Sequence, residues 1–123
     1  MKRVKGYLAA VVPMLVSFSV ATAGLTVVDA KLGKGVQNRE IVGETASFAV
    51  NEKAYLLLRV TGGPGELEVT WSHGDHSETI PLNVGGNPWR TWANKTLWTA
   101  GDWKVTVTDG DGQMLEEISF QVR

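Results

Sequence analysis

Two short turns carry the residue types that metal chemistry needs. The first, His73 to His76, reads His-Gly-Asp-His, and zinc and copper accept imidazole with carboxylate. The second, Asp109 to Gly112, resembles the start of a calcium loop, but Gln113 and Met114 stand where an EF-hand needs a ligand and a glycine. Both tetrapeptides are also typical of tight hairpins. We therefore expect two hairpin turns, no metal site and no cofactor.

Enzymatic catalysis has little support in the residue pattern. A nucleophilic Ser, Thr or Cys needs a base beside it, yet both histidines lie in one turn and the chain has no cysteine. Paired carboxylates need a buried cleft, whereas Glu66 with Glu68, and Glu116 with Glu117, fall on outward phases or strand ends. We expect that the protein is not an enzyme.

Tryptophan is the residue type that sets this sequence apart, because four of the five indoles fall between Asn87 and Trp103. If the middle of this stretch is extended, alternate side chains share one side of it. One side then carries Arg90, Trp92, Asn94, Thr96 and Trp98. The candidate binding residues are accordingly Trp89, Arg90, Trp92, Asn94 and Trp98.

Two arrangements are compatible with this pattern. In the first, which we favour, the Arg90 guanidinium stacks on Trp92 to close one end of the fold, with Trp89 as a cap behind Pro88. In the second, Trp89, Trp92 and Trp98 form an exposed platform for a sugar ring or a partner chain, and Arg90 and Asn94 orient the ligand. The exposure of Trp92 and Trp98 decides between the two.

The elements that position these side chains read as strands at short, regular spacing. Leu67, Val69 and Trp71 alternate with polar residues, and so do Trp103, Val105 and Val107, so both indoles are expected in the core. The other inward sets are Ile80, Leu82 and Val84 on an edge strand with Pro81; Leu56, Leu58 and Val60 on a central strand; Ile118, Phe120 and Val122 at the end; and Val28, Ala30, Leu32, Phe48 and Val50 on weaker early strands. The sequence therefore predicts an all-β fold, an immunoglobulin-like antiparallel β-sandwich of seven to eight strands.

Residues 1–23 have the pattern of a secretory signal peptide. Basic residues precede an apolar stretch, and Ala21-Thr22-Ala23 offers a small-residue cleavage site. The alternative is a retained membrane anchor, which Pro13 and two serines in the stretch disfavour. We expect cleavage after Ala23, a periplasmic or secreted protein that is free of the membrane, and a single domain over residues 24–123.

The charge balance narrows the class of partner. Loss of three of the twelve basic residues with the signal leaves nine against thirteen acidic ones, a net charge of about −4. A mildly acidic surface argues against nucleic acid, whose phosphates require a basic face. The absence of cysteine also excludes sites built on thiolates.

Several motifs also suggest a family. Asn38-Arg39-Glu40, Trp71 at the end of a Val-Thr strand, the Trp-Arg-Thr-Trp segment from Trp89 to Trp92, and the closing hairpin from Gly101 to Val122 together resemble a bacterial family known as domain of unknown function 2914. The resemblance covers about residues 30–123 and implies an exported or membrane-attached bacterial β domain with no assigned activity. Two positions depart from the family pattern: Ile41 stands where the family has proline, and Trp98 where it has no aromatic residue.

The combined interpretation is a non-catalytic binding or assembly module. Its expected partner is another envelope or extracellular protein, which meets the Trp89 to Trp98 region or a free sheet edge. The alternative is a carbohydrate-binding module for envelope or extracellular glycan, with the same tryptophans as its platform.

Overall fold

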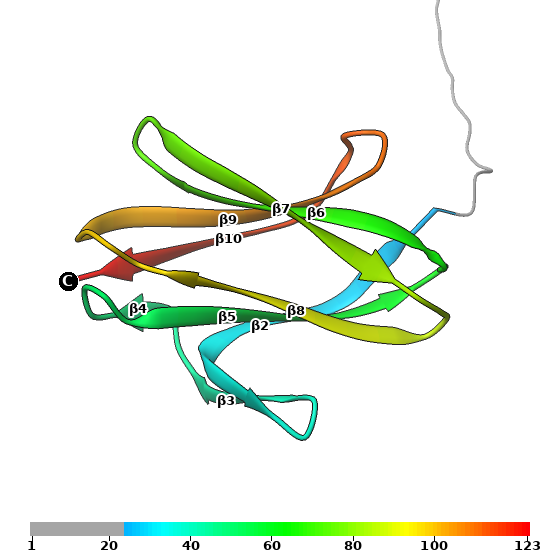
Figure 1. The fold of residues 1–123 in the computed structure, drawn as a ribbon, viewed down its shortest axis with the longest axis horizontal. Coiled ribbons are helices and arrows are strands. Elements are labelled where there is room, and N and C mark those ends of the chain that lie inside the picture. The colour runs from blue at the N-terminus through cyan, green and yellow to red at the C-terminus, as the bar shows by residue number, and fades with distance from the viewer. Residues whose placement is uncertain (1–23) are drawn as a thin grey trace, which may run out of the picture.

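The computed structural model describes residues 24–123, which form nine β-strands in two facing sheets (Figure 1). The predicted signal peptide and its cleavage site lie outside the described residues. In spatial order, the five-stranded sheet consists of β4 (Ser47–Phe48), β10 (Met114–Val122), β9 (Gly101–Asp109), β6 (Gly65–His73) and β7 (His76–Val84). The four-stranded sheet consists of β3 (Glu40–Glu44), β2 (Thr26–Gln37), β5 (Lys53–Thr61) and β8 (Trp89–Thr96).

The predicted fold class, an all-β sandwich of two sheets, is confirmed. The described strands number nine rather than seven or eight because the five-residue β3 shows little alternation in the sequence; β4, two residues long, falls within the weak strand predicted around Phe48. All neighbours pair antiparallel except β4 and β10, which run parallel. In residues 24–123 there is no helix long and apolar enough to cross a membrane.

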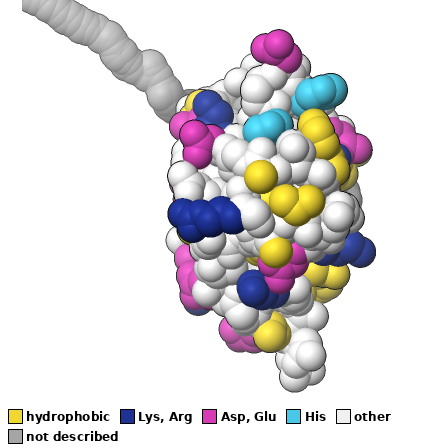
Figure 2. All heavy atoms as spheres, turned by 90° about the vertical axis from the view of Figure 1, so that its left-hand side faces the viewer, with side chains coloured by type: hydrophobic (Ala, Val, Ile, Leu, Met, Phe, Trp, Pro, Cys, Tyr) yellow, Lys and Arg dark blue, Asp and Glu magenta, His cyan; other side chains and the backbone are white. Residues whose placement is uncertain are grey.

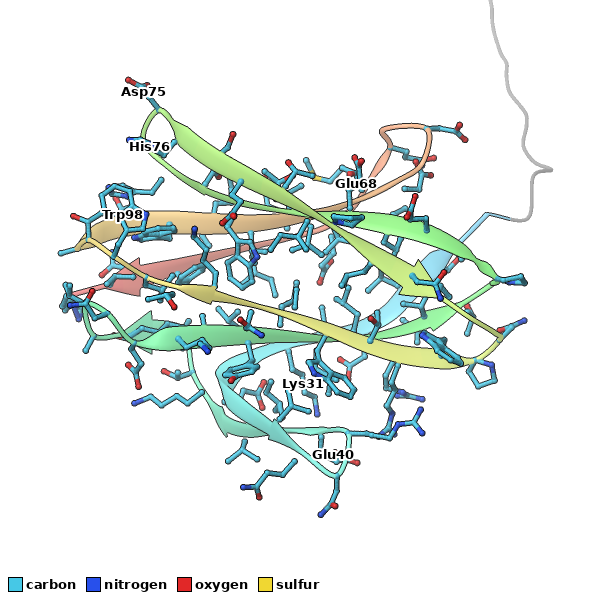
Figure 3. All side chains as sticks on the ribbon, viewed as in Figure 1. Lys31, Glu40, Glu68, Asp75, His76 and Trp98 are labelled. Carbon is cyan, nitrogen blue, oxygen red and sulfur yellow. The ribbon has the colours of Figure 1, made fainter. Side chains whose placement is uncertain are left out.

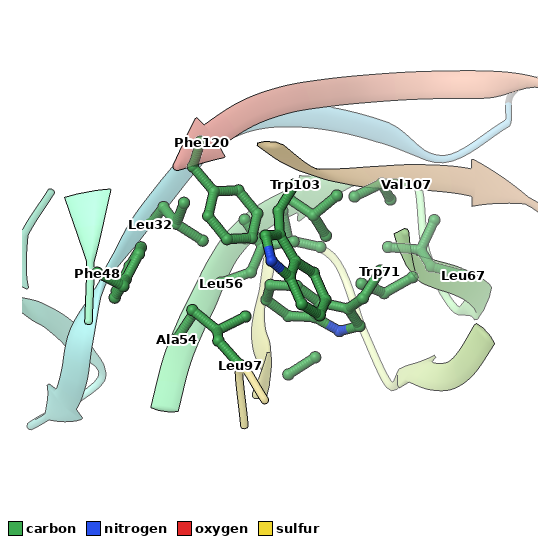
Figure 4. Packing of buried hydrophobic residues seen from close by; sticks show 14 of the residues in the cluster. Leu32, Phe48, Ala54, Leu56, Leu67, Trp71, Leu97, Trp103, Val107 and Phe120 are labelled. Atoms are coloured by element: carbon green, nitrogen blue, oxygen red, sulfur yellow. The ribbon is translucent and has the colours of Figure 1, made fainter. Parts of the chain in front are cut away.

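Side-chain alternation forms the core between the sheets (Figure 4). In β6 and β9 the directly opposed pairs Val69–Val107 and Trp71–Val105 are all buried. Since each strand presents every second side chain to one face, the apolar set of each strand meets that of its neighbour. Trp71 and Trp103 are therefore core residues, 1% and 3% exposed, as the sequence predicts.

Aromatic rings from four strands of the five-stranded sheet, β4, β10, β9 and β6, pack against one another on its core face. Phe120 of β10 makes an edge contact with Phe48 at 5.6 Å between ring centroids, and another with Trp71 at 6.1 Å. It also stacks on Trp103 at 6.3 Å. Leu56, Leu58 and Val60 of the central strand β5 are fully buried, as predicted. Aromatic pairs in these geometries contribute about 0.5–1.5 kcal/mol each beyond area burial.

Two expected core residues lie on the surface instead. Val28 is 51% exposed because the pairing of β2 with β5 shifts register between Val27 and Asp29, so that Val27 takes the inward position. Val50 is 40% exposed because β4 ends at Phe48 and the chain then turns through Asn51, whose φ is 71°. Neither irregularity has a signal in the spacing of apolar residues.

One edge strand of each sheet, β7 in the five-stranded sheet and β8 in the four-stranded sheet, lies near the other sheet. β7 ends the five-stranded sheet with Pro81 exposed, which confirms the predicted edge strand. β8 ends the four-stranded sheet, and Lys95 of β8 forms an ion pair with Glu78 of β7 across the gap between the sheets. In Figure 1, β7 and β8 converge toward the turn that joins them and diverge toward their other ends. The edge strand β8 carries most of the candidate binding residues.

Candidate functional site

Strand β8 places Trp92 on the outer face of the four-stranded sheet. Its side chains alternate as predicted, since Trp92 is 40% exposed while its neighbour Ala93 is buried. Trp92 lies opposite Leu57 and Asn94 lies opposite Tyr55 in the register of β5 and β8. Directly opposed residues share one face of a sheet, so the indole, the amide and the phenol ring are neighbours there. Leu57 is nearly buried although it also points outward, because the side chains around it cover it.

Trp89 lies at the start of β8 and is held by the turn from β7. Its indole covers Gly85 so closely that a β-carbon at that position would stand 2.9 Å from Cη2. Glycine is therefore required at position 85 for the ring to lie where it does. The turn is fixed further by Asn87, whose Oδ1 accepts a hydrogen bond of 3.1 Å from the backbone N–H of Gly62. Trp89 remains 37% exposed.

Trp98 lies at the opposite end of β8, where the two sheets meet (Figure 3). Its ring makes edge contacts with His73 at 5.8 Å, His76 at 5.3 Å and Trp103 at 6.0 Å between centroids. His73 stacks on Trp103 at 5.0 Å, so four aromatic rings form one cluster. Figure 2 views this end of the molecule and shows both histidines beside exposed hydrophobic side chains. Trp98 is 46% exposed.

The structure does not bring the candidate tryptophans together as one flat platform. Trp92 points away from the core, whereas Trp98 contacts residues of the five-stranded sheet at the end of the sandwich. At about 3.3 Å per residue, an extended chain separates Trp89 from Trp92 by about 10 Å and Trp92 from Trp98 by about 20 Å. The three exposed indoles therefore lie at separate places: Trp89 opposite Val60 at the start of β8, Trp92 on the outer face, and Trp98 beyond the end of the strand.

Arg90 does not stack on Trp92 within the described residues, so the expected guanidinium–indole contact is wrong. Its Nη1 instead donates a 2.9 Å hydrogen bond to the carbonyl oxygen of Arg39 and lies 3.4 Å from Oε2 of Glu40. This hydrogen bond ties the start of β8 to the β2–β3 turn, which lies on the outer side of the four-stranded sheet, with Glu40 labelled in Figure 3. A long-range contact of this kind has no local signal in the sequence.

A small cavity of about 160 Å³ lies under Trp98 between the sheets. Its lining includes Trp71, Trp98, His76 and the Glu78–Lys95 ion pair. The indole Nε1 of Trp71 is buried with no hydrogen-bond partner among the described residues. A buried N–H without an acceptor is costly, so Trp71 stabilises this part of the core through packing and not through its N–H.

The two turns that suggested metal chemistry are hairpins. His73 to His76 joins β6 to β7, and His73 Nδ1 lies 2.9 Å from the carbonyl oxygen of Asp102. Asp109 Oδ1 accepts hydrogen bonds of 2.9 Å from the backbone N–H groups of Asp111 and Gln113, which shapes the β9–β10 turn. Across residues 24–123 no three His, Asp or Glu side chains gather as metal ligands would.

A further hollow lies over the five-stranded sheet. It measures about 650 Å³ and is lined on three adjacent strands by Ser72, Lys104 and Ser119, with Asp102 and Gln121 beside them. Gln121 Nε2 donates to Asp102 Oδ1 at 3.0 Å, so polar groups here already pair with one another. We place no binding site in this hollow.

Comparison with known proteins gives a family but no activity. A family model described as "Protein of unknown function (DUF2914)" matches residues 66–122. Over these residues the chain is similar to the DUF2914 family. The match contains β7–β10 and nearly all of β6, with all five tryptophans, and confirms the predicted resemblance there. The Asn38-Arg39-Glu40 step lies outside it. No curated protein matches the chain.

Proposed function

We propose that this protein is an exported, non-catalytic module that binds another protein along the free edge of β8. The observation that carries the proposal is an eight-residue edge strand, paired only with β5 among the described strands, beside which three indoles are exposed. An unpaired edge presents backbone N–H and C=O groups to which an extended chain can add as a further strand.

The character of the edge supports this proposal. Natural proteins usually protect free edges with proline, charge or a cover. Pro81 provides such protection in β7, whereas β8 has no proline between Trp89 and Thr96, and its Lys95 is paired with Glu78 of β7. Trp89 and Trp92 lie on β8 and Trp98 lies two residues beyond its end, so exposed indoles stand at both ends and in the middle of this edge, where an extended polypeptide could contact them. Tryptophan is also the residue most enriched where protein contacts are strongest.

A glycan is the second candidate ligand, and one observation favours it. Trp92 shares the flat outward face of the four-stranded sheet with Tyr55 and Asn94, so two aromatic rings and an amide are neighbours. A sugar ring can lie on such a surface while polar groups orient it. A glycan makes no use of the free backbone groups of β8, and we therefore rank it second.

The test compares two exposed hydrophobic residues on different sheets. Trp92→Ala should abolish co-purification of a partner protein from envelope extract, while Met114→Ala, at a residue 55% exposed on β10, should leave it unchanged. Both variants should keep the wild-type melting temperature, because neither side chain is in the core. In parallel, an oligosaccharide panel should leave the tryptophan fluorescence of the wild type unchanged. Saturable quenching by one glycan, lost in Trp92→Ala, would replace the protein-contact proposal with the glycan one.

A further inference from the structure

Three of the four arginines in residues 24–123 line one cavity at the Trp89 end of β8. The cavity measures about 170 Å³, and Arg39, Arg59 and Arg90 come to it from three different segments: the β2–β3 turn, β5 and β8. Its remaining lining is Val28, Val60, Thr61, Pro88 and Trp89. No carboxylate lines it among the described residues, although acidic residues outnumber basic ones there.

The backbone forces two of these charges together. Arg59 and Arg90 are directly opposed in the register of β5 and β8, and like charges in that position repel. A sheet without a ligand gains nothing from this pairing. An anion placed between the two guanidinium groups would relieve the repulsion.

The third arginine is held over the sheet by its own backbone. Arg39 has a φ of 63°, a left-handed conformation that is uncommon for residues other than glycine. Its carbonyl oxygen accepts the 2.9 Å hydrogen bond from Arg90 Nη1, which ties the β2–β3 turn to β8. The turn therefore brings Arg39 to the cavity wall without using the Arg39 side chain as the anchor.

Nearby acidic residues neutralise only part of this charge. Glu40 lies 3.4 Å from Arg90, but its side chain is 67% exposed. Asp29 lies opposite Arg59 in the register of β2 and β5, and its carboxylate is 4.0 Å from Lys31. For the guanidinium groups of Arg39 and Arg59 there is no ion pair within the described residues.

We propose that Arg39, Arg59 and Arg90 form a carboxylate-binding site that receives an acidic group of the polypeptide docked along β8. Guanidinium groups bind carboxylates through paired hydrogen bonds, and several such groups around one cavity match an oxyanion better than a cation or a neutral group. The exposed rings of Trp89 and Pro88 beside the cavity accommodate the apolar part of the same residue. The carboxylate comes either from a Glu or Asp side chain or from the C-terminus of the partner.

An anionic membrane is the less suitable occupant. A membrane surface attracts proteins through a broad basic face, whereas this chain has a net negative charge and gathers its arginines around one small cavity. The assignment of the carboxylate to a polypeptide rests on the proposed function. The presence of an oxyanion site does not, and the two can fail separately.

The test uses three synthetic eight-residue peptides of alternating Thr and Val. One has a free C-terminal carboxylate, one has an internal Glu and an amidated C-terminus, and one is amidated and neutral. Binding is followed by NMR, at the side-chain N–H signals of arginine and of Trp89 and at the backbone amides of β8. We expect at least one acidic peptide to bind tenfold or more tightly than the neutral one, and which of the two does so identifies the source of the carboxylate. The difference in affinity between the acidic and the neutral peptides should decrease as salt is added.

Arg59→Gln should remove the preference for the acidic peptides, while Arg123→Gln, which alters the one described arginine outside the cavity, should retain it. Equal binding of neutral and acidic peptides, or a preference that survives Arg59→Gln, would overturn the carboxylate site while leaving strand docking intact. Shifts of the arginine signals without shifts of the β8 amides would support the carboxylate site and contradict the proposed docking. Binding to anionic lipid vesicles that depends on Arg59, with no preference among the peptides, would assign the arginines to a membrane and overturn the proposal.

Discussion

At the scale of single residues, the two core tryptophans differ in how their indole N–H groups are satisfied. Trp103 Nε1 donates a 3.0 Å hydrogen bond to the carbonyl oxygen of Thr99, whereas Trp71 Nε1 is buried without a partner. Replacement by Phe removes a similar volume at either position. At Trp103 it also leaves a carbonyl oxygen without its donor, while at Trp71 it removes an unpaired polar group.

Trp71→Phe should therefore destabilise the fold less than Trp103→Phe. We expect the difference to be about 1 kcal/mol or more in the free energy of unfolding, measured by urea denaturation. The corresponding alanine variants serve as controls, and each should lose about 3–5 kcal/mol. Equal losses for the two Phe variants would indicate that the Trp71 N–H has an acceptor in solution.

Glu52 gives the fold a defined response to acid. Its Oε1 accepts a 2.9 Å hydrogen bond from the backbone N–H of Ala49, and Lys34 Nζ lies 3.2 Å from its Oε2. These contacts, the backbone hydrogen bond first, lower the pKa of the Glu52 carboxyl below its ordinary value of 4.5. A lowered folded-state pKa stabilises the fold above the unfolded-state value, and the contribution is lost as pH falls through the folded-state value.

Glu52→Gln should therefore be less stable than the wild type at pH 7. Below pH 4.5 the gap should close as the wild-type carboxylate takes up its proton. Urea denaturation at a series of pH values from neutral to acidic measures the gap. A gap that stays constant, or widens, in acid would show that Glu52 does not act through its charge.

At the scale of elements, the β2–β3 hairpin depends on one close backbone approach. A β-carbon at Gly33 would stand 2.7 Å from Ile41 Cγ1 and 2.9 Å from the carbonyl oxygen of Val42. The second atom belongs to the backbone and cannot move alone. At Gly35, two residues further along β2, a β-carbon would meet nothing within 4 Å.

Gly33→Ala should therefore lower the free energy of unfolding by about 1–3 kcal/mol, the usual cost of overpacking. Gly35→Ala is the matched control and should be neutral or slightly stabilising, since alanine suits a strand better than glycine does. Thermal unfolding of the two variants measures the difference. Similar melting temperatures for the two variants would mean that β3 does not approach β2 at Gly33 as closely as described.

For most strands, the sequence was enough to predict which side chains point inward. Alternation identifies the inward residues of β5, β6, β9 and β10, because a strand buries every second side chain whatever its neighbours are. It failed at Val28 and Val50, where a register shift and a turn break the alternation. It also grouped Trp98 with Trp92 as if β8 continued, although the strand ends at Thr96.

At the scale of the whole molecule, the candidate surface depends on pairing that local sequence does not encode. The sequence predicts that Arg90 stacks on its near neighbour Trp92, but its guanidinium donates a hydrogen bond to Arg39, which is distant in the sequence. Arg59 and Tyr55 join the same face only because β5 is the strand that pairs with β8. The types of the candidate residues could be predicted, whereas their grouping follows from the order of strands in the sheet.

The most direct measurement of the proposed function is cross-linking from the β8 edge inside cells. A photoreactive phenylalanine analogue replaces Trp92 in one variant and Met114 in another, and each is irradiated at matched expression. We expect position 92 to form a discrete cross-link to another polypeptide, lost when Trp89→Ala is added, while position 114 on the other sheet forms none. No cross-link from position 92, or the same products from both positions, would contradict β8 as the binding edge.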